Sequence, residues 1–271
     1  MLSILNSISS LTAENALSST QTSLQNTLTQ LSTGLKINSG ADDAAGLSIA
    51  NGLQANISAL TQSSQNASDG VGLLQTADGA LSQVTSLLDR AVTLATEAST
   101  GGLSTSQATA LDTEFQSIVT EIGNIGTTTN YNGTSIFGAS SNIYTTDGTT
   151  GGSSTVTTAI AALTTGGLGL TGTALTSTAA AQTALTDISA AISTIAANRG
   201  SIGASVNRLT AAANVENTEV TNLTAAQNNV QNADIGKTVA QMTQYSILQQ
   251  TGMAALSQSN QIQQAVLKLL Q

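Results

Sequence analysis

Few residues of this chain could do acid–base or metal chemistry. Cysteine and histidine are both absent, which removes thiolate nucleophiles, histidine bases and the common zinc ligand sets. One remaining acidic pair, Asp112 and Glu114, lies two residues apart in a helical segment. Because residues two apart on a helix point to different faces, these carboxylates do not form an acid and base pair. We therefore expect no enzymatic activity, no catalytic residue and no cofactor.

The second acidic pair, Asp42 and Asp43, follows a glycine-rich stretch that interrupts a helical pattern. Gly34 and Gly40 let the chain leave one helix and turn. Asp42 and Asp43 then place negative charge at the N-terminal end of the next helix, where one of them can cap it. The alternative is a divalent cation site, but two adjacent carboxylates without further ligands nearby do not favour it. We interpret the stretch as a helix cap and predict no metal site.

Composition indicates long helices with an unusual surface. Proline is absent, so long uninterrupted helices are allowed, and aromatic residues make up only 2% of the chain. Charged residues make up 8%, and the six basic residues are scattered singly within a net charge of -9, which argues against nucleic-acid binding. There is no continuous apolar run of about 18 residues and no secretory leader pattern. We expect no membrane partner, and export without a cleaved signal peptide.

Apolar residues recur at heptad spacing in both terminal thirds of the chain. Leu17, Leu24, Leu28, Leu31 and Leu35 show steps of 7, 4, 3 and 4, and a longer run occupies the region of residues 185–230. A middle segment rich in Thr, Gly and Asn contains the turn pairs Asn132-Gly133 and Asp147-Gly148. The predicted fold is mostly α, a long antiparallel coiled-coil helical rod with terminal assembly helices and a small β-hairpin-containing insert.

The terminal helices lack a large partner within one chain. Each has an apolar stripe and only the other terminus to pack against, so a pair of them is marginal alone. Such a pair gains stability by burying its outer face against other copies, which predicts self-assembly. We expect this assembly to use the following apolar positions of the two ends: Leu17, Leu24, Leu28, Leu31, Leu256, Ile262, Val266 and Leu269.

The end regions resemble those of bacterial flagellins. The resemblance is carried by LSTGLKINSGADDAAGLSIAN (31–51), QNASDGVGLLQTADGALSQV (65–84), NRLTAAANVENTEVTNLTAAQNNVQNADI (207–235) and ILQQTGMAALSQSNQIQQAVLKLL (247–270). It covers about residues 1–126 and 178–271, while the middle matches nothing specific. The resemblance implies a structural subunit that self-assembles into the helical flagellar filament and enables swimming. The alternatives in the same architecture are a hook-filament junction protein and a minor filament subunit. A chemoreceptor-like helical hairpin would need membrane spans or a sensory domain.

The resemblance also implies a domain plan and partners. In flagellins the terminal helices form an inner tube, two joints act as spokes, and the long helices form an outer tube with the variable insert facing solvent. Implied partners are other copies of the chain, an export chaperone, the filament cap and the hook-filament junction proteins, after secretion by the flagellar type III apparatus. The plan divides this chain into 1–33 and 239–271 (inner tube), 34–43 and 231–238 (spokes), 44–126 and 178–230 (rod), and 127–177 (insert).

A further implied partner is Toll-like receptor 5. The matching contact positions here are Arg90, Leu94 and Glu114. The family's second arginine is replaced by Val92, and two further positions differ at Asp89 and Thr93, so reduced recognition is expected. The competing interpretation is that Leu94 packs in a core and that Arg90 is a solvated or subunit-interface charge.

Overall fold

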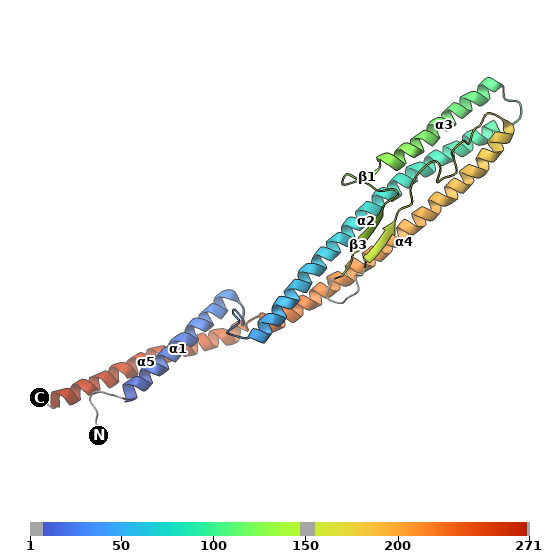
Figure 1. Cartoon of the computed structure of the whole chain (residues 1–271). Coiled ribbons are helices and arrows are strands. Elements are labelled where there is room, and N and C mark those ends of the chain that lie inside the picture. The colour runs from blue at the N-terminus through green and yellow to red at the C-terminus, as the bar shows by residue number, and fades with distance from the viewer. Residues whose placement is uncertain (1–7, 147–154, 270–271) are drawn as a thin grey trace. The chain divides into compact units, whose positions relative to one another are not determined.

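A computed structural model describes residues 8–146 and 155–269 (Figure 1). Helices make up most of this part of the chain, so the prediction of a mostly α fold is confirmed. The elements, in chain order, are α1 (Ile8–Thr33), α2 (Ala44–Ala98), α3 (Thr105–Thr128), β1 (Asn130–Tyr131), β2 (Thr134–Ser135), β3 (Ser140–Tyr144), β4 (Thr155–Ala159), α4 (Thr178–Gln231) and α5 (Ile235–Leu269).

The chain divides into two compact units. One comprises Met1–Ala55 with Asn222–Gln271, and the other comprises Asn56–Thr221. Helices α2 and α4 contribute to both units, because each contains more than 50 residues without a proline.

In the unit Asn56–Thr221, α2 and α4 form an antiparallel coiled coil. Ser64 of α2 lies 3.3 Å from Asn217 of α4, and further along α2 Asp78 meets Arg199, which comes earlier in α4. The register therefore runs in opposite directions on the two helices. Within this unit, α2 carries a run of buried residues in steps of three and four, the spacing of a coiled-coil seam: Leu60, Ser63, Ala67, Gly70, Leu74, Ala77, Leu81, Val84, Leu88, Ala91, Ala95 and Ala98. Leu94 is buried beside this run.

Helix α3 runs alongside the C-terminal part of α2 (Figure 1). It begins after a capping box in which Ser104 and Gln107 satisfy each other's backbone donors. The helix ends at Thr128. Gly126, in the last turns of the helix, lets the backbone of Leu163 lie directly against α3.

The insert contains two separate hairpins. In the first, Asn132 and Gly133 have φ values of 50° and 78°, as the two central residues of a type I′ turn require, so the predicted turn is confirmed. In the second, β3 and β4 are antiparallel partners; the predicted Asp147-Gly148 turn lies outside the described residues. The insert is not simply a solvent-facing loop, because it adds these side chains to the core of the unit: Ile136, Phe137, Ile143, Val156, Ile160, Leu163, Leu168, Leu170 and Leu175.

The close approach at Gly126 leads to a stability prediction. A Cβ at position 126 would overlap the carbonyl oxygen of Leu163, whereas a Cβ at Gly123 would meet a Thr165 methyl group at 3.5 Å, an ordinary contact. We expect Gly126→Ala to lower the free energy of unfolding by about 1–3 kcal/mol through overpacking. Gly123→Ala is the matched control and should raise it by about 0.5–1 kcal/mol, because alanine favours a helix interior. Urea unfolding followed by circular dichroism measures both, and equal effects of the two substitutions would contradict the packing argument.

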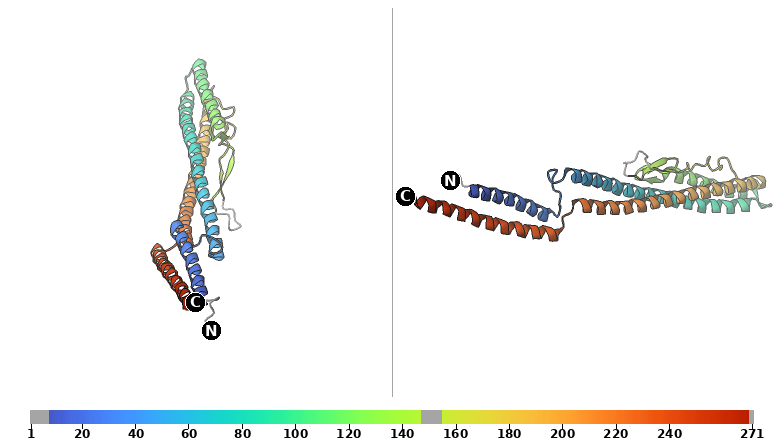
Figure 2. Two further views of the ribbon diagram at one scale, coloured as in Figure 1. Left: turned by 90° about the vertical axis from the view of Figure 1, so that its left-hand side faces the viewer. Right: turned by 90° about the horizontal axis from the view of Figure 1, so that it is seen from below.

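In the unit formed by the two ends, α1 and α5 lie side by side and antiparallel (Figure 2). Ser10 hydrogen-bonds Ser259 at 2.9 Å, and Leu17 lies against Gly252, so positions early in α1 meet positions late in α5. Within the predicted joint 231–238, α4 ends at Gln231 and α5 begins at Ile235. Asp234 caps that start by accepting from the backbone N–H of Lys237 at 3.1 Å.

Candidate assembly surface

Among their described residues, helices α1 and α5 pair along a seam without a buried apolar core. Leu17, Leu24 and Leu31 recur every seven residues on α1 and are half-buried, as is Leu256 on α5. Among the side chains described on these two helices, only Thr27 and Thr238 are buried, at 5% and 4% exposure. The pair therefore removes little apolar area from water, whereas the unit Asn56–Thr221 has a continuous apolar core.

A set of large apolar side chains remains exposed along both helices. Their exposed fractions lie between 40% and 80%. Exposed apolar surface of this extent on an otherwise thin helix pair is typical of a protein interaction surface. The residues are Ile8, Leu11 and Leu28 on α1, and Ile235, Val239, Ile247, Leu248, Met253 and Ile262 on α5.

The residues predicted for assembly fall into three groups in the structure. Leu17, Leu24, Leu31 and Leu256 are half-buried within the helix pair, while Leu28 and Ile262 are exposed. The side chains of Val266 and Leu269 lie outside the described residues. The predicted set omits Ile247, Leu248 and Met253, although their apolar types are visible in the sequence. Heptad periodicity identifies the seam of a helix pair but not the apolar residues that flank it on the outer face.

The two joints between helices are hydrogen-bonded to each other. Lys36 N–H donates to the carbonyl oxygen of Gln231 at 2.7 Å, and Ala233 N–H donates to the carbonyl oxygen of Gly34 at 2.9 Å. Gly34 has a φ of 72°, the left-handed conformation that favours glycine, whereas Gly40 is not among the glycines with positive φ.

Asp42 and Asp43 stabilise different parts of the first joint. The Asp42 carboxylate accepts from the backbone N–H groups of Asn38 and Ser39 at 3.0 and 2.9 Å, and these bonds hold its pKa below the ordinary value. The Asp43 carboxylate accepts from Gly46 N–H at 2.9 Å and so caps the first turn of α2. Each carboxylate therefore has its own backbone donors, as capping requires.

The three residues predicted to contact Toll-like receptor 5 do not form one surface. Arg90 donates to Glu114 at 2.8 Å across α2 and α3, and both side chains are about half exposed. Leu94 is fully buried in the core. Asp112, two residues from Glu114, accepts instead from the backbone N–H of Leu175 at 2.7 Å, so the two carboxylates face different partners as their spacing predicts.

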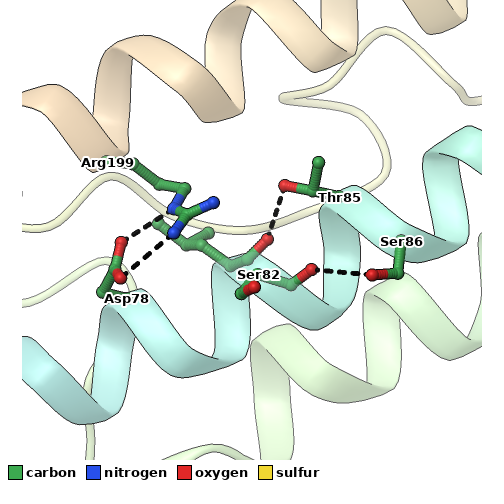
Figure 3. A network of polar contacts seen from close by, with 6 residues as sticks. Asp78, Ser82, Thr85, Ser86 and Arg199 are labelled. Carbon is green, nitrogen blue, oxygen red and sulfur yellow. Dashed lines mark hydrogen bonds and ion pairs between the residues drawn. The ribbon is translucent and has the colours of Figure 1, made fainter.

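A second ion pair joins the long helices. The Arg199 guanidinium donates to both carboxylate oxygens of Asp78, at 2.8 and 3.2 Å (Figure 3). These hydrogen bonds, and then the charge of Asp78, raise the pKa of Arg199. Because both side chains are more than a third exposed, the pair contributes roughly 1 kcal/mol at most to stability. The pair links the two helices across their antiparallel packing.

The helices and their exposed side chains indicate the class of the protein. The helical core consists of a long antiparallel coiled coil, and the described residues of the two end helices include exposed apolar side chains. Among the described residues no group of three His, Cys, Asp or Glu side chains could hold a metal ion. None of the described helices is apolar enough over a sufficient length to cross a bilayer. The architecture is that of a long helical coiled coil joined to a smaller helix pair with exposed apolar side chains.

Comparison with known proteins identifies the family. Residues 4–142 match the bacterial flagellin N-terminal helical region, and residues 185–270 match the bacterial flagellin C-terminal helical region. A flagellin from Halalkalibacterium halodurans is 34% identical over 251 residues, which is 91% of each chain. A flagellin from Serratia marcescens is 42% identical over 127 residues, which is 47% of this chain and 36% of the relative. The crystal structure of Bacillus cereus flagellin is 32% identical with a TM-score of 0.51, covering 60% of this chain and 94% of that one.

The chain belongs to the bacterial flagellin family, the structural subunits of the flagellar filament. The prediction made from its end motifs is thereby confirmed, and no finding favours the junction-protein alternative.

Proposed function

We propose that copies of this chain join into the flagellar filament through the exposed apolar faces of α1 and α5. The observation that supports this proposal is the contrast between the apolar core of Asn56–Thr221 and the absence of any buried apolar side chain among those described on α1 and α5. Burying these faces between copies supplies the apolar area that the pair lacks. In this proposal residues 1–33 and 239–271 form an inner tube, 34–43 and 231–238 are spokes, 44–126 and 178–230 form the outer rod, and 127–177 faces away from the filament axis.

A matched pair of substitutions tests the surface. Ile247 on α5 and Tyr144 on β3 are both 58% exposed, but only Ile247 lies on the proposed surface. We expect Ile247→Ser to raise the critical concentration for polymerisation about tenfold, since about 1.4 kcal/mol of apolar burial is lost per contact. Tyr144→Ser should leave it unchanged.

The readout is the growth of filaments from short seeds or after addition of a precipitating salt, seen by electron microscopy. Thermal unfolding of the monomer shows whether each variant is folded. Similar polymerisation of the two folded variants would argue that α5 does not carry the assembly contact.

Before assembly, a partner that binds α5 would shield its exposed apolar side chains from water. We propose that a flagellar export chaperone binds α5 and that the chain leaves the cell through the flagellar type III apparatus without a cleaved signal peptide. We further propose that it adds beneath the filament cap, distal to the hook-filament junction proteins. The exposure of Ile247, Leu248 and Met253 supports the chaperone contact, and membership of the family supports the route.

For Toll-like receptor 5, we propose a contact through Arg90 and Glu114 without Leu94. The ion pair is exposed, whereas Leu94 is inside the core and cannot reach a partner while the unit is folded. Replacing both charged residues by alanine should lower receptor activation severalfold in a reporter-cell assay with monomeric protein. The matched control replaces Asp78 and Arg199, which also form an exposed ion pair, and should leave activation unchanged. Equal activation by both double variants would show that Arg90 and Glu114 do not contact the receptor.

A further inference from the structure

A hydroxyl group joins three elements at one end of the coiled coil. Ser63 Oγ of α2 lies 2.8 Å from Glu216 Oε1 of α4 and 3.1 Å from the carbonyl oxygen of Tyr144 in β3. Ser63 and Glu216 are both buried, at 3% and 4% exposure. These contacts tie the β3–β4 hairpin to both long helices.

The three oxygen atoms need two protons for their two hydrogen bonds. A serine hydroxyl supplies one proton, and neither a peptide carbonyl nor an ionised carboxylate supplies any. With Glu216 ionised, Ser63 can donate to Glu216 or to Tyr144 but not to both. With Glu216 protonated, its O–H donates to Ser63 Oγ while the Ser63 O–H donates to the Tyr144 carbonyl. Only the neutral acid satisfies both contacts.

The surroundings of Glu216 also favour the neutral form. Its Oε2 atom is buried without a hydrogen-bond partner, and none of the ion pairs found among the described residues involves Glu216. An uncompensated buried carboxylate is costly. Burial raises the pKa of Glu216, the hydrogen bond from Ser63 lowers it, and the charge of Glu219 raises it.

Few titratable groups lie on the elements around this site. On α4 these are Glu219, about one turn after Glu216, and Arg208, about two turns before Glu216. On α2 the nearest in sequence is Asp69, which accepts from Gln65, and β3 contributes the exposed phenol of Tyr144.

We propose that Glu216, Ser63 and the Tyr144 carbonyl form a proton-binding site that docks the β3–β4 hairpin on the α2/α4 coiled coil. When Glu216 binds its proton, both hydrogen bonds are made and the hairpin is held. When Glu216 loses the proton, the buried carboxylate competes with Tyr144 for the Ser63 proton, and the hydrogen bond that ties the hairpin to the helices is weakened. The site makes the docking of the insert sensitive to pH.

The direction of the pH effect follows from linkage. The folded protein holds the proton to a higher pH than the unfolded chain, where glutamate has a pKa of about 4.3. The stabilisation is complete below that value and is lost as pH rises through the pKa of the folded state.

Carbon NMR of the whole chain tests the proton directly. The glutamates are Glu14, Glu97, Glu114, Glu121, Glu216 and Glu219, so labelling only the glutamate carboxyl carbons gives a small set of resonances. We expect one resonance to titrate at higher pH than the rest and to be missing in Glu216→Gln. If every glutamate titrates near pH 4 in the wild-type protein, the proposal is wrong, and this result does not depend on whether any variant folds.

Variants test the link to the hairpin. Glutamine keeps an N–H donor toward Ser63 at every pH, so the β3 amides of Glu216→Gln should exchange with deuterium more slowly than those of the wild type at pH 8. The two proteins should exchange equally at a pH below the Glu216 titration that NMR measures. The control Glu97→Gln changes an exposed glutamate of α2 and should behave as the wild type at both pH values. Equal exchange in the wild type and Glu216→Gln at pH 8 would overturn the coupling between this proton and the hairpin.

Discussion

Deletion of residues 1–30 is expected to leave a folded monomer that forms no filaments. The unit Asn56–Thr221 has its own apolar core, made by α2, α3, α4 and the insert, and none of that core comes from α1. The deletion removes almost all of α1, and with it Leu17 and Leu24 of the seam and the exposed Leu28. Deletion of residues 245–271 should have the same effect, because it removes most of α5.

The experiment compares the full-length chain with the two deletions. Circular dichroism during heating reports whether the Asn56–Thr221 unit still unfolds cooperatively, and electron microscopy after seeding reports assembly. Filaments grown from either truncated protein would show that the end helices are not required for assembly. Loss of cooperative unfolding would show instead that the long helices depend on α1 and α5 for their stability.

Replacing Leu209 by aspartate is expected to have the largest effect of any single substitution on stability. Leu209 is fully buried, and its side chain lies beside Gly70 of α2 and Ile143 of β3, so three elements meet around it. The substitution creates a cavity and buries a charge without a partner. We expect a loss of roughly 3–5 kcal/mol in the free energy of unfolding.

Two positions of the same helix provide a graded comparison. Val220 is half-buried, so Val220→Asp should cost less than Leu209→Asp, and Val215 is 65% exposed, so Val215→Asp should change stability by less than about 0.5 kcal/mol. Chemical unfolding of the three variants measures the order. An equal effect at Leu209 and Val215 would mean that the α2/α4 seam does not carry the stability of the unit.

Much of the helical architecture could be predicted from local sequence. The absence of proline and the recurrence of apolar residues in steps of three and four predict long helices that pair along a seam, since a helix must bury one face. The glycine-rich stretch before Asp42 predicts a turn and a capped helix start, because left-handed backbone and an N-terminal acceptor are local requirements. The end motifs identify the family without any coordinates.

Contacts between distant segments could not be predicted in this way. Periodicity identifies the face that a helix buries, but it does not say which side chains of another element meet that face. Leu94 and Arg90 lie one turn apart, yet Leu94 is in the core and Arg90 pairs with Glu114 of α3. The apolar residues of the insert show no regular period, so their packing on the coiled coil appears only in the structure.

Glu216 shows most clearly which features the sequence predicts and which only the tertiary structure decides. In the sequence it occupies the seam position midway between Ala213 and Val220, so a charged residue at an apolar position of the heptad pattern is already visible. What the sequence does not contain is its partner. Ser63 lies 153 residues away, and the Tyr144 carbonyl belongs to a third element. The sequence alone determined the helices, their apolar faces and the family, because these depend on local chemistry and recurring motifs. The tertiary structure decided which groups share a proton and which apolar side chains remain exposed, because both depend on atoms that only folding brings together.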